Sequence, residues 1–102
     1  MAVAALAGAL LQRATVRGPA IIGSGARISD AYIGPYTAIG DDVVIDRAEL
    51  EHSIVLSGST VRDLEYRIEA SLIGKDVRIG RGPPLPKAYR FVVGDHADVQ
   101  IL

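Results

Sequence analysis

Residues 28–45 read Ile28-Ser-Asp-Ala-Tyr-Ile33-Gly-Pro-Tyr-Thr-Ala-Ile39-Gly-Asp-Asp-Val-Val-Ile45, with an isoleucine at every fifth or sixth position. The same spacing, with steps of five to seven residues, continues on both sides of this stretch. It forms a ladder of aliphatic residues: Leu11, Val16, Ile22, Ile28, Ile33, Ile39, Ile45, Leu50, Val55, Val61, Ile68, Ile73 and Ile79. Three steps make a unit of about 17 or 18 residues, which is too short to enclose its own core, so successive units must stack.

The ladder predicts an all-β fold, a parallel β-solenoid of about four to five coils. Of its 13 aliphatic residues, 11 are Ile or Val, which pack well on a pleated surface. Steps of five to seven do not sustain the 3.6-residue period of a helix, and the recurrent glycines would break one. The ladder divides into three inward columns of a triangular prism: Val16, Ile33, Leu50, Ile68; Ile22, Ile39, Val55, Ile73; and Leu11, Ile28, Ile45, Val61, Ile79.

The residues between the ladder positions predict the corners. Six of the steps are hexads, and four of these have glycine directly after the aliphatic residue, at Gly23, Gly34, Gly40 and Gly74, where we expect the chain to turn. The fifth hexad positions are all small or β-branched, which predicts that they lie close to the next coil: Ala20, Ala26, Thr37, Val43, Ser59 and Val77.

The composition limits the classes of function. A chain of 102 residues forms one domain at most, which we place over residues 1–102. The net charge of −1 predicts no nucleic acid or anionic membrane as partner. The chain has no cysteine, which excludes thiol chemistry and fits a cytoplasmic protein. The apolar start has no preceding basic residue and is too short to span a bilayer.

The ladder also divides the domain. Residues 1–15 read as a degraded first coil, because a shift by 17 places Leu11 on Ile28 and Val16 on Ile33. Residues 16–80 are the regular coils. Residues 81–102 begin with the proline-rich Arg81-Gly-Pro-Pro-Leu-Pro and read as a tail that caps the C-terminal end of the solenoid. The N-terminal end then has the thinner cover and is expected to be the stickier edge.

The hexads resemble the left-handed parallel β-helix, or hexapeptide-repeat, superfamily, and this resemblance implies a left-handed coil. A narrower resemblance is carried by the segments Val16-Arg-Gly-Pro-Ala-Ile-Ile-Gly23, Ala31-Tyr-Ile-Gly-Pro-Tyr-Thr-Ala-Ile-Gly40, Glu51-His-Ser-Ile-Val55, Ile68-Glu-Ala-Ser-Leu-Ile-Gly74 and Arg90-Phe-Val-Val-Gly-Asp-His96. These segments resemble the C-terminal domain of long-form glucose-1-phosphate thymidylyltransferases, and the resemblance covers residues 9–102.

That family joins glucose 1-phosphate to dTTP, giving dTDP-glucose and pyrophosphate, in a separate N-terminal nucleotidyltransferase domain. The glycine-rich phosphate loop of that domain is absent here: Gly80-Arg-Gly82 runs directly into Pro83 and Pro84, which donate no N–H. The resemblance therefore implies a fragment, or a free-standing gene that kept only the solenoid. We expect an assembly or regulatory module that needs no cofactor and is not an enzyme by itself.

A minimal acyl-CoA-dependent acyltransferase is the alternative, because such enzymes of the superfamily use a histidine base. The candidates are His52, which follows Glu51, and His96; an ordinary surface or interface histidine is the simpler interpretation of both. Two histidines are too few for a three-histidine zinc site, and no metal site is predicted. The basic residues Lys75, Arg78, Arg81, Lys87 and Arg90 could bind an anion or a nucleotide sugar, but their spacing favours solvated surface charge.

The aromatic residues predict contacts with other subunits. Tyr32, Tyr36, Tyr66, Tyr89 and Phe91 all lie outside the ladder, so they are expected on the surface of the solenoid, where aromatic side chains commonly anchor interfaces. We therefore expect a homo-oligomer, either a trimer or a dimer, and a separate nucleotidyltransferase domain as a further partner.

Overall fold

The structure is a computed structural model that describes residues 3–81, 95 and 99. This part of the chain forms short β-strands and no helix. The strands are β1 Val3–Ala5, β2 Leu10–Gln12, β3 Thr15–Val16, β4 Ala20–Ile22, β5 Arg27–Ser29, β6 Tyr32–Ile33, β7 Thr37–Ile39, β8 Val44–Asp46, β9 Glu49–Glu51, β10 Ile54–Val55, β11 Thr60–Arg62, β12 Ile68–Glu69, β13 Leu72–Ile73 and β14 Arg78–Ile79. No helix that could span a bilayer occurs among the described residues.

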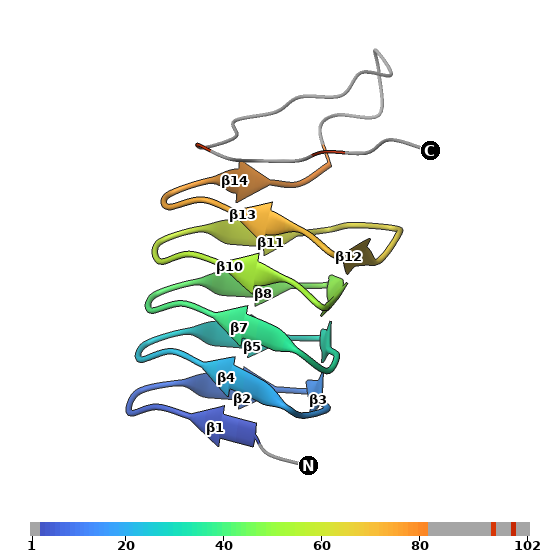
Figure 1. The fold of residues 1–102 in the computed structure, drawn as a ribbon. Coiled ribbons are helices and arrows are strands. Elements are labelled where there is room, and N and C mark those ends of the chain that lie inside the picture. Colours follow the sequence, from blue (N-terminus) through green and yellow to red (C-terminus); the bar gives the residue numbers. More distant parts are fainter. Residues whose placement is uncertain (1–2, 82–94, 96–98, 100–102) are drawn as a thin grey trace.

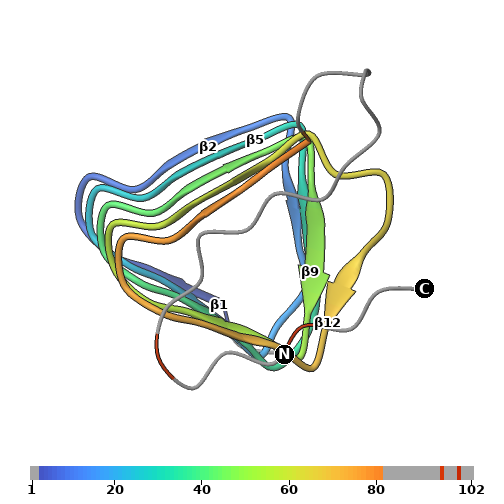
Figure 2. The ribbon, with the colours of Figure 1, turned by 90° about the horizontal axis from the view of Figure 1, so that it is seen from above.

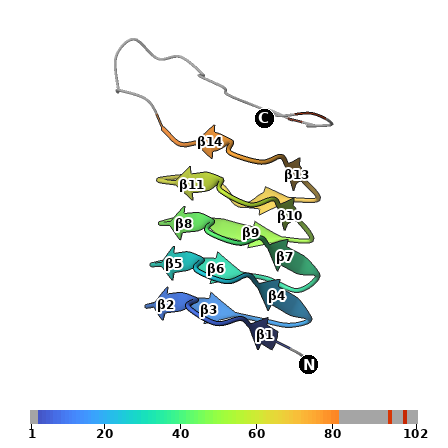
Figure 3. The same cartoon turned by 90° about the vertical axis from the view of Figure 1, so that its left-hand side faces the viewer.

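The strands build a solenoid of about five coils with a triangular cross-section (Figures 1 and 2). Each side of the triangle is a parallel sheet: sheet A in the order β1-β4-β7-β10-β13, sheet B in the order β2-β5-β8-β11-β14, and sheet C in the order β3-β6-β9-β12. The chain rises toward the viewer clockwise in Figure 2, so the coil is left-handed. Figure 3 shows the coils stacked one above the other with an even spacing. The predicted fold class is confirmed.

The three predicted columns are also confirmed by the strand register. In sheet B, Leu11 pairs with Ile28, Ile28 with Ile45, Ile45 with Val61 and Val61 with Ile79. Sheets A and C align their columns in the same way. The middle members of the columns are between 0% and 2% exposed, so the stacked aliphatic side chains form one narrow core along the whole solenoid.

The small residues predicted to lie against the next coil are buried. Ala20, Ala26, Thr37, Val43, Ser59 and Val77 are all 4% exposed or less. Ser59 is satisfied within the core, since its hydroxyl donates to the Gly74 carbonyl at 2.6 Å and accepts from the Val77 N–H at 3.0 Å. A larger side chain at any of these positions would have to separate two coils.

The glycines at the corners differ from the prediction in their physical role. Gly23 and Gly40 lie at the corner after sheet A, but the residues with positive φ there are Gly8, Gly25, Asp42, Gly58 and Asp76. Gly23 is needed for close packing instead, because a Cβ atom on it would lie 2.5 Å from the Gly40 carbonyl carbon of the next coil. The backbone bends two residues later than the sequence pattern indicated.

The structure describes the predicted first coil but only three residues of the predicted capping tail. Residues 3–16 form β1, β2 and β3, which pair with β4, β5 and β6 as a first coil. Its inward residue Leu11 is 41% exposed, whereas Ile28 one coil above is 1% exposed, so the N-terminal end of the core is open to solvent. The predicted capping tail, residues 81–102, lies outside the described residues except for Arg81, Asp95 and Val99.

Candidate functional site

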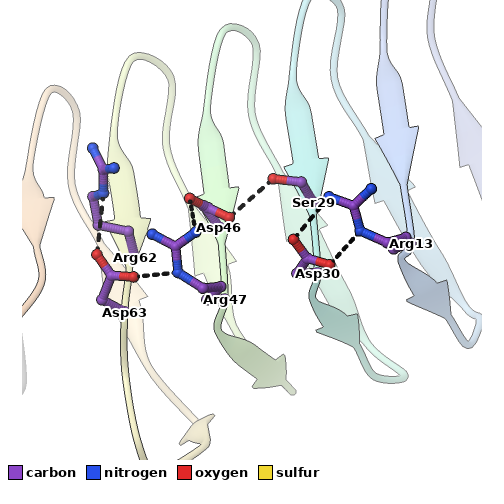
Figure 4. Close-up of polar contacts among 7 residues, drawn as sticks. All are labelled: Arg13, Ser29, Asp30, Asp46, Arg47, Arg62 and Asp63. Atoms are coloured by element: carbon purple, nitrogen blue, oxygen red, sulfur yellow. Dashed lines mark hydrogen bonds and ion pairs between the residues drawn. The ribbon is translucent and has the colours of Figure 1, made fainter.

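Charged residues alternate along the edge between sheets B and C. We call Arg13, Asp30, Arg47 and Asp63 the charged corner; one of them directly follows each of the strands β2, β5, β8 and β11. All four have left-handed backbone conformations, with φ between 48° and 55°. A residue at this bend directs its side chain out of the solenoid, so the four side chains form a column on the surface (Figure 4).

The charged corner is held by ion pairs between adjacent coils (Figure 4). The guanidinium of Arg13 donates to both carboxylate oxygens of Asp30, at 2.6 and 3.0 Å. Arg47 Nε donates to Asp63 Oδ1 at 2.5 Å, and Arg47 Nη1 lies 3.2 Å from Asp46. Each arginine in the column is therefore already paired with a carboxylate, and the column joins coils as well as carrying charge.

These pairs shift the pKa values of the aspartates. Hydrogen bonding from Arg13, and secondarily its positive charge, holds the pKa of Asp30 below its ordinary value, and burial opposes this only in part. Arg47 lowers the pKa of Asp63 in the same way. The pKa values of both arginines are raised in return, chiefly by the same hydrogen bonds. Both aspartates are charged at neutral pH, and the column is close to electrically neutral.

An open hollow of about 320 Å³ lies beside the charged corner. Its floor includes Tyr32, whose ring has the Arg67 guanidinium 4.7 Å from its centroid. Arg67 in turn donates to Glu49 at 2.8 Å, so this arginine is paired as well. An anion entering the hollow would have to displace carboxylates from the guanidinium groups. The lining residues are Arg13, Asp30, Ala31, Tyr32, Arg47, Ala48, Glu49, Leu64 and Glu65.

His52, the first predicted alternative base, lies at the edge between sheets C and A. Its ring packs against Tyr36 of the coil below, with ring centroids 5.3 Å apart and the planes tilted by 59°. Both residues have positive φ, 50° for His52 and 60° for Tyr36. The neighbouring carboxylate does not join them, because Glu51 Oε2 lies 3.5 Å from Arg67. The structure therefore shows an aromatic pair here, and the catalytic role of His52 stays a prediction.

The other predicted site residues are scattered or lie outside the described part. His96, Lys87 and Arg90 are among the residues that the structure does not describe. Lys75, Arg78 and Arg81 are exposed. Within residues 3–81, 95 and 99, no three His, Cys, Asp or Glu side chains gather as metal ligands would.

The charged corner was missed by sequence reasoning, although a signal for it exists. Arg13, Asp30 and Arg47 follow one another at intervals of 17 residues, which is the length of a coil, and Asp63 follows 16 residues later. Alignment of the chain on its own repeat brings the four residues into one column with alternating sign. The aromatic residues Tyr36 and Tyr66 are exposed as predicted, at 66% and 81%.

Comparison with known proteins identifies the family of this solenoid. Residues 16–101 match the family model described as the GMPPB C-terminal domain. The chain is 44% identical over 94 residues to a glucose-1-phosphate thymidylyltransferase of Streptomyces griseus and 47% identical over 94 residues to one of Streptomyces antibioticus, in each case over 92% of this chain and 26% of the relative. It is 38% identical over 71 residues to the low-salt glycan biosynthesis nucleotidyltransferase Agl11 of Haloferax volcanii, over 69% of this chain and 20% of that protein.

The chain thus spans about a quarter of the length of the two thymidylyltransferases, and the resemblance noted in the sequence is confirmed. The match covers Asp30, Arg47 and Asp63 of the charged corner and the Tyr36–His52 pair, and it continues beyond the regular coils to residue 101. This left-handed β-solenoid belongs to the GMPPB C-terminal domain family.

Proposed function

We propose that this chain is the non-catalytic assembly and regulatory module of a nucleotidyltransferase of the glucose-1-phosphate thymidylyltransferase class, active in dTDP-glucose synthesis. One observation carries the proposal: about nine-tenths of the chain matches two such enzymes at 44% and 47% identity, yet it accounts for only 26% of their length. The hexapeptide-repeat interpretation of the coils and a cytoplasmic location belong to the same proposal.

The surface chemistry supports a structural role. The arginines beside the hollow are already engaged by Asp30, Asp63 and Glu49, and a phosphate would have to compete with all three carboxylates. The main chain of each coil is hydrogen-bonded to the next, and the side chains of the core stack in continuous columns. Such a solenoid is suited to holding attached domains at a fixed separation.

The acyltransferase alternative gains no support from the geometry around His52. A general base must reach the proton it removes, and a carboxylate partner would orient the imidazole. Here the imidazole packs against Tyr36, and the adjacent Glu51 faces Arg67. The geometry around His52 therefore favours the assembly module over the acyltransferase.

The proposal is tested by domain replacement in the Streptomyces griseus relative. Three proteins are compared: the intact relative, a version truncated before the 94 matched residues, and a chimera in which this chain replaces those residues. Thermal stability, molar mass and the rate of pyrophosphate release from dTTP and glucose 1-phosphate are measured for each. We expect the chimera to recover what the truncation loses, because the exchanged segments are 44% identical over 94 residues.

A matched control tests whether the gain depends on a stable solenoid core. A second chimera carries Ile45→Ala, which weakens the solenoid core without changing its surface, since Ile45 is fully buried. If the module acts as a folded support, this chimera should lose its gain at a lower temperature than the first. A first chimera that contains folded solenoid but behaves like the truncated enzyme in all three measurements would reject the proposal.

A further inference from the structure

The outward side of sheet A carries an unbroken row of apolar residues. Strands β1, β4, β7, β10 and β13 each direct one residue outward, and the register places these residues next to one another. Ile21, the middle residue of β4, is 54% exposed, and Ile54, the first residue of β10, is 47% exposed. We call this set the apolar row: Ala4, Ile21, Ala38, Ile54 and Leu72.

The outward sides of the other two sheets are different. Sheet B places Arg27, Asp46, Arg62 and Arg78 on its outer surface. Sheet C carries the carboxylates of Glu49, Glu51 and Glu69. Among the described residues, sheet A is thus the only side of the prism whose outward strand positions hold no charge.

The apolar row continues at its edges. Leu6 and Leu56 lie at the corner between sheets A and B and are 50% and 37% exposed, and Tyr36 lies at the opposite corner and is 66% exposed. Clustered apolar surface of this kind marks contact sites, whereas isolated exposed apolar residues do not. A partner for the row must itself be flat and apolar, because the row offers it no charge and no free backbone hydrogen bond.

We propose that the apolar row pairs with the apolar row of a second copy of this chain, in a two-fold symmetric dimer. The inference rests on the assembly role proposed above and assigns a surface to it. In a two-fold contact the same patch serves both subunits, so the patch must fit itself. The row meets this requirement, because it has no charges to repel one another and its residues alternate in size from Ala4 to Ile54.

The alternation also selects a register for the two solenoids. Facing layers pack best when a large side chain meets a small one. With the solenoids antiparallel and the two-fold axis between β4 and β7, Ile21 faces Ala38 of the second copy and Ala4 faces Ile54. All four contacts then join a large residue to a small one. With the solenoids parallel and in register, Ile21 would face its own copy and Ala38 would leave a gap.

The size of the face predicts a weak dimer. In this register four strands of each copy overlap, and Leu72 of β13 lies beyond the overlap. Four strands about 4.8 Å apart span about 15 Å along the solenoid, and a side of about five residues spans about 16 Å, so the overlapping face covers roughly 240 Å² in projection. Stable complexes bury about 1,200–2,000 Å² over both partners, which two such faces do not reach. The dimer should therefore dissociate on dilution into the micromolar range.

The first experiment measures molar mass by light scattering over a wide dilution series of the complete chain. The parent should rise from 10.8 kDa toward twice that mass. Ile21→Glu/Ile54→Glu should weaken association about 100-fold or more, because each charge enters the interface twice. Val44→Glu is the matched control, since Val44 points outward from the middle of sheet B, and it should not change association. Circular dichroism verifies folding, and Ile21→Thr/Ile54→Thr replaces the glutamate variant if that variant unfolds.

The second experiment tests the register by exchanging sizes. Ile21→Ala and Ala38→Ile should each weaken the dimer about tenfold, and the combined variant should return to within a few-fold of the parent, because the facing large–small pair is rebuilt. A monomer at all concentrations, a trimer, or a dimer indifferent to the sheet A variants would overturn the proposal. A monomer whose chimera still restores the relative would reject this surface only, whereas a dimer whose chimera fails would reject the assembly function only.

Discussion

The stacked columns make a quantitative prediction about Ile45 and Leu11. Both residues belong to the same inward column of sheet B, but Ile45 is fully buried between two coils whereas Leu11 is 41% exposed at the open end. Replacement by alanine removes three carbon atoms in either case. The chemistry of the change is therefore matched, and only the position along the solenoid differs.

The magnitudes follow from burial. Three buried carbons are worth about 2.4 kcal/mol of transfer free energy, and the closed cavity left at Ile45 raises the expected loss to about 3–4 kcal/mol. Leu11 is only about three-fifths buried, so its replacement loses about three-fifths of that transfer free energy. No closed cavity forms at the open end, and the expected loss is about 1.4 kcal/mol. The difference of about 2 kcal/mol corresponds to roughly 8–16 °C in Tm for a domain of this size.

The assay is urea unfolding followed by circular dichroism, with a thermal scan as a second measurement. The slope of the free energy of unfolding against urea must stay the same in the parent and both variants, so that midpoints can be compared. Ile45→Ala should shift the midpoint well beyond Leu11→Ala. Equal shifts, or a larger one for Leu11→Ala, would refute the view that the first coil is the open end of the core.

Three further predictions concern backbone, buried polar groups and charge. Gly25→Ala should destabilise the fold more than Gly8→Ala in urea titrations: both glycines have positive φ, but only at Gly25 would the new Cβ force the Asp42 carboxylate of the next coil to move aside. Ser59→Ala should cost about 2 kcal/mol by the same measurement, because it leaves two buried backbone groups without a partner. Asp63 has a lowered pKa in the folded state, so its contribution to stability is complete above the pKa of about 3.9 that it has in the unfolded chain. That contribution disappears as the pH falls through the lower pKa of the folded state. Arg47→Gln should therefore reduce the fall of Tm at acid pH, and an unchanged profile of Tm against pH would contradict this prediction.

The core of the fold could be predicted because it obeys one local rule. Each inward residue stacks on its own copy in the next coil, so the interval between aliphatic residues shows directly which residues share a column. The register of Ile28, Ile45 and Val61 was therefore readable from spacing alone. The handedness was not, since a left-handed and a right-handed coil present the same spacing.

The corners could be predicted only in part, because what they require depends on the adjacent coil. Gly23 looks like a residue chosen for its flexibility, but its reason is the Gly40 backbone lying against it. Arg13 and Arg47 adopt a left-handed conformation that nothing in their neighbouring residues indicates, and their partners lie one coil away. The exposed row on sheet A likewise becomes visible only when the outward residue of each strand is known.

The most direct test of the account is the rate of pyrophosphate release from dTTP and glucose 1-phosphate in the presence of Mg²⁺. It is measured with this chain alone, with the truncated Streptomyces griseus relative alone, and with the two mixed. The account predicts no turnover above background for the chain alone and a rate for the mixture at least as high as that of the truncated enzyme. Turnover by the chain alone that scales with its concentration and survives repurification would contradict the non-catalytic role.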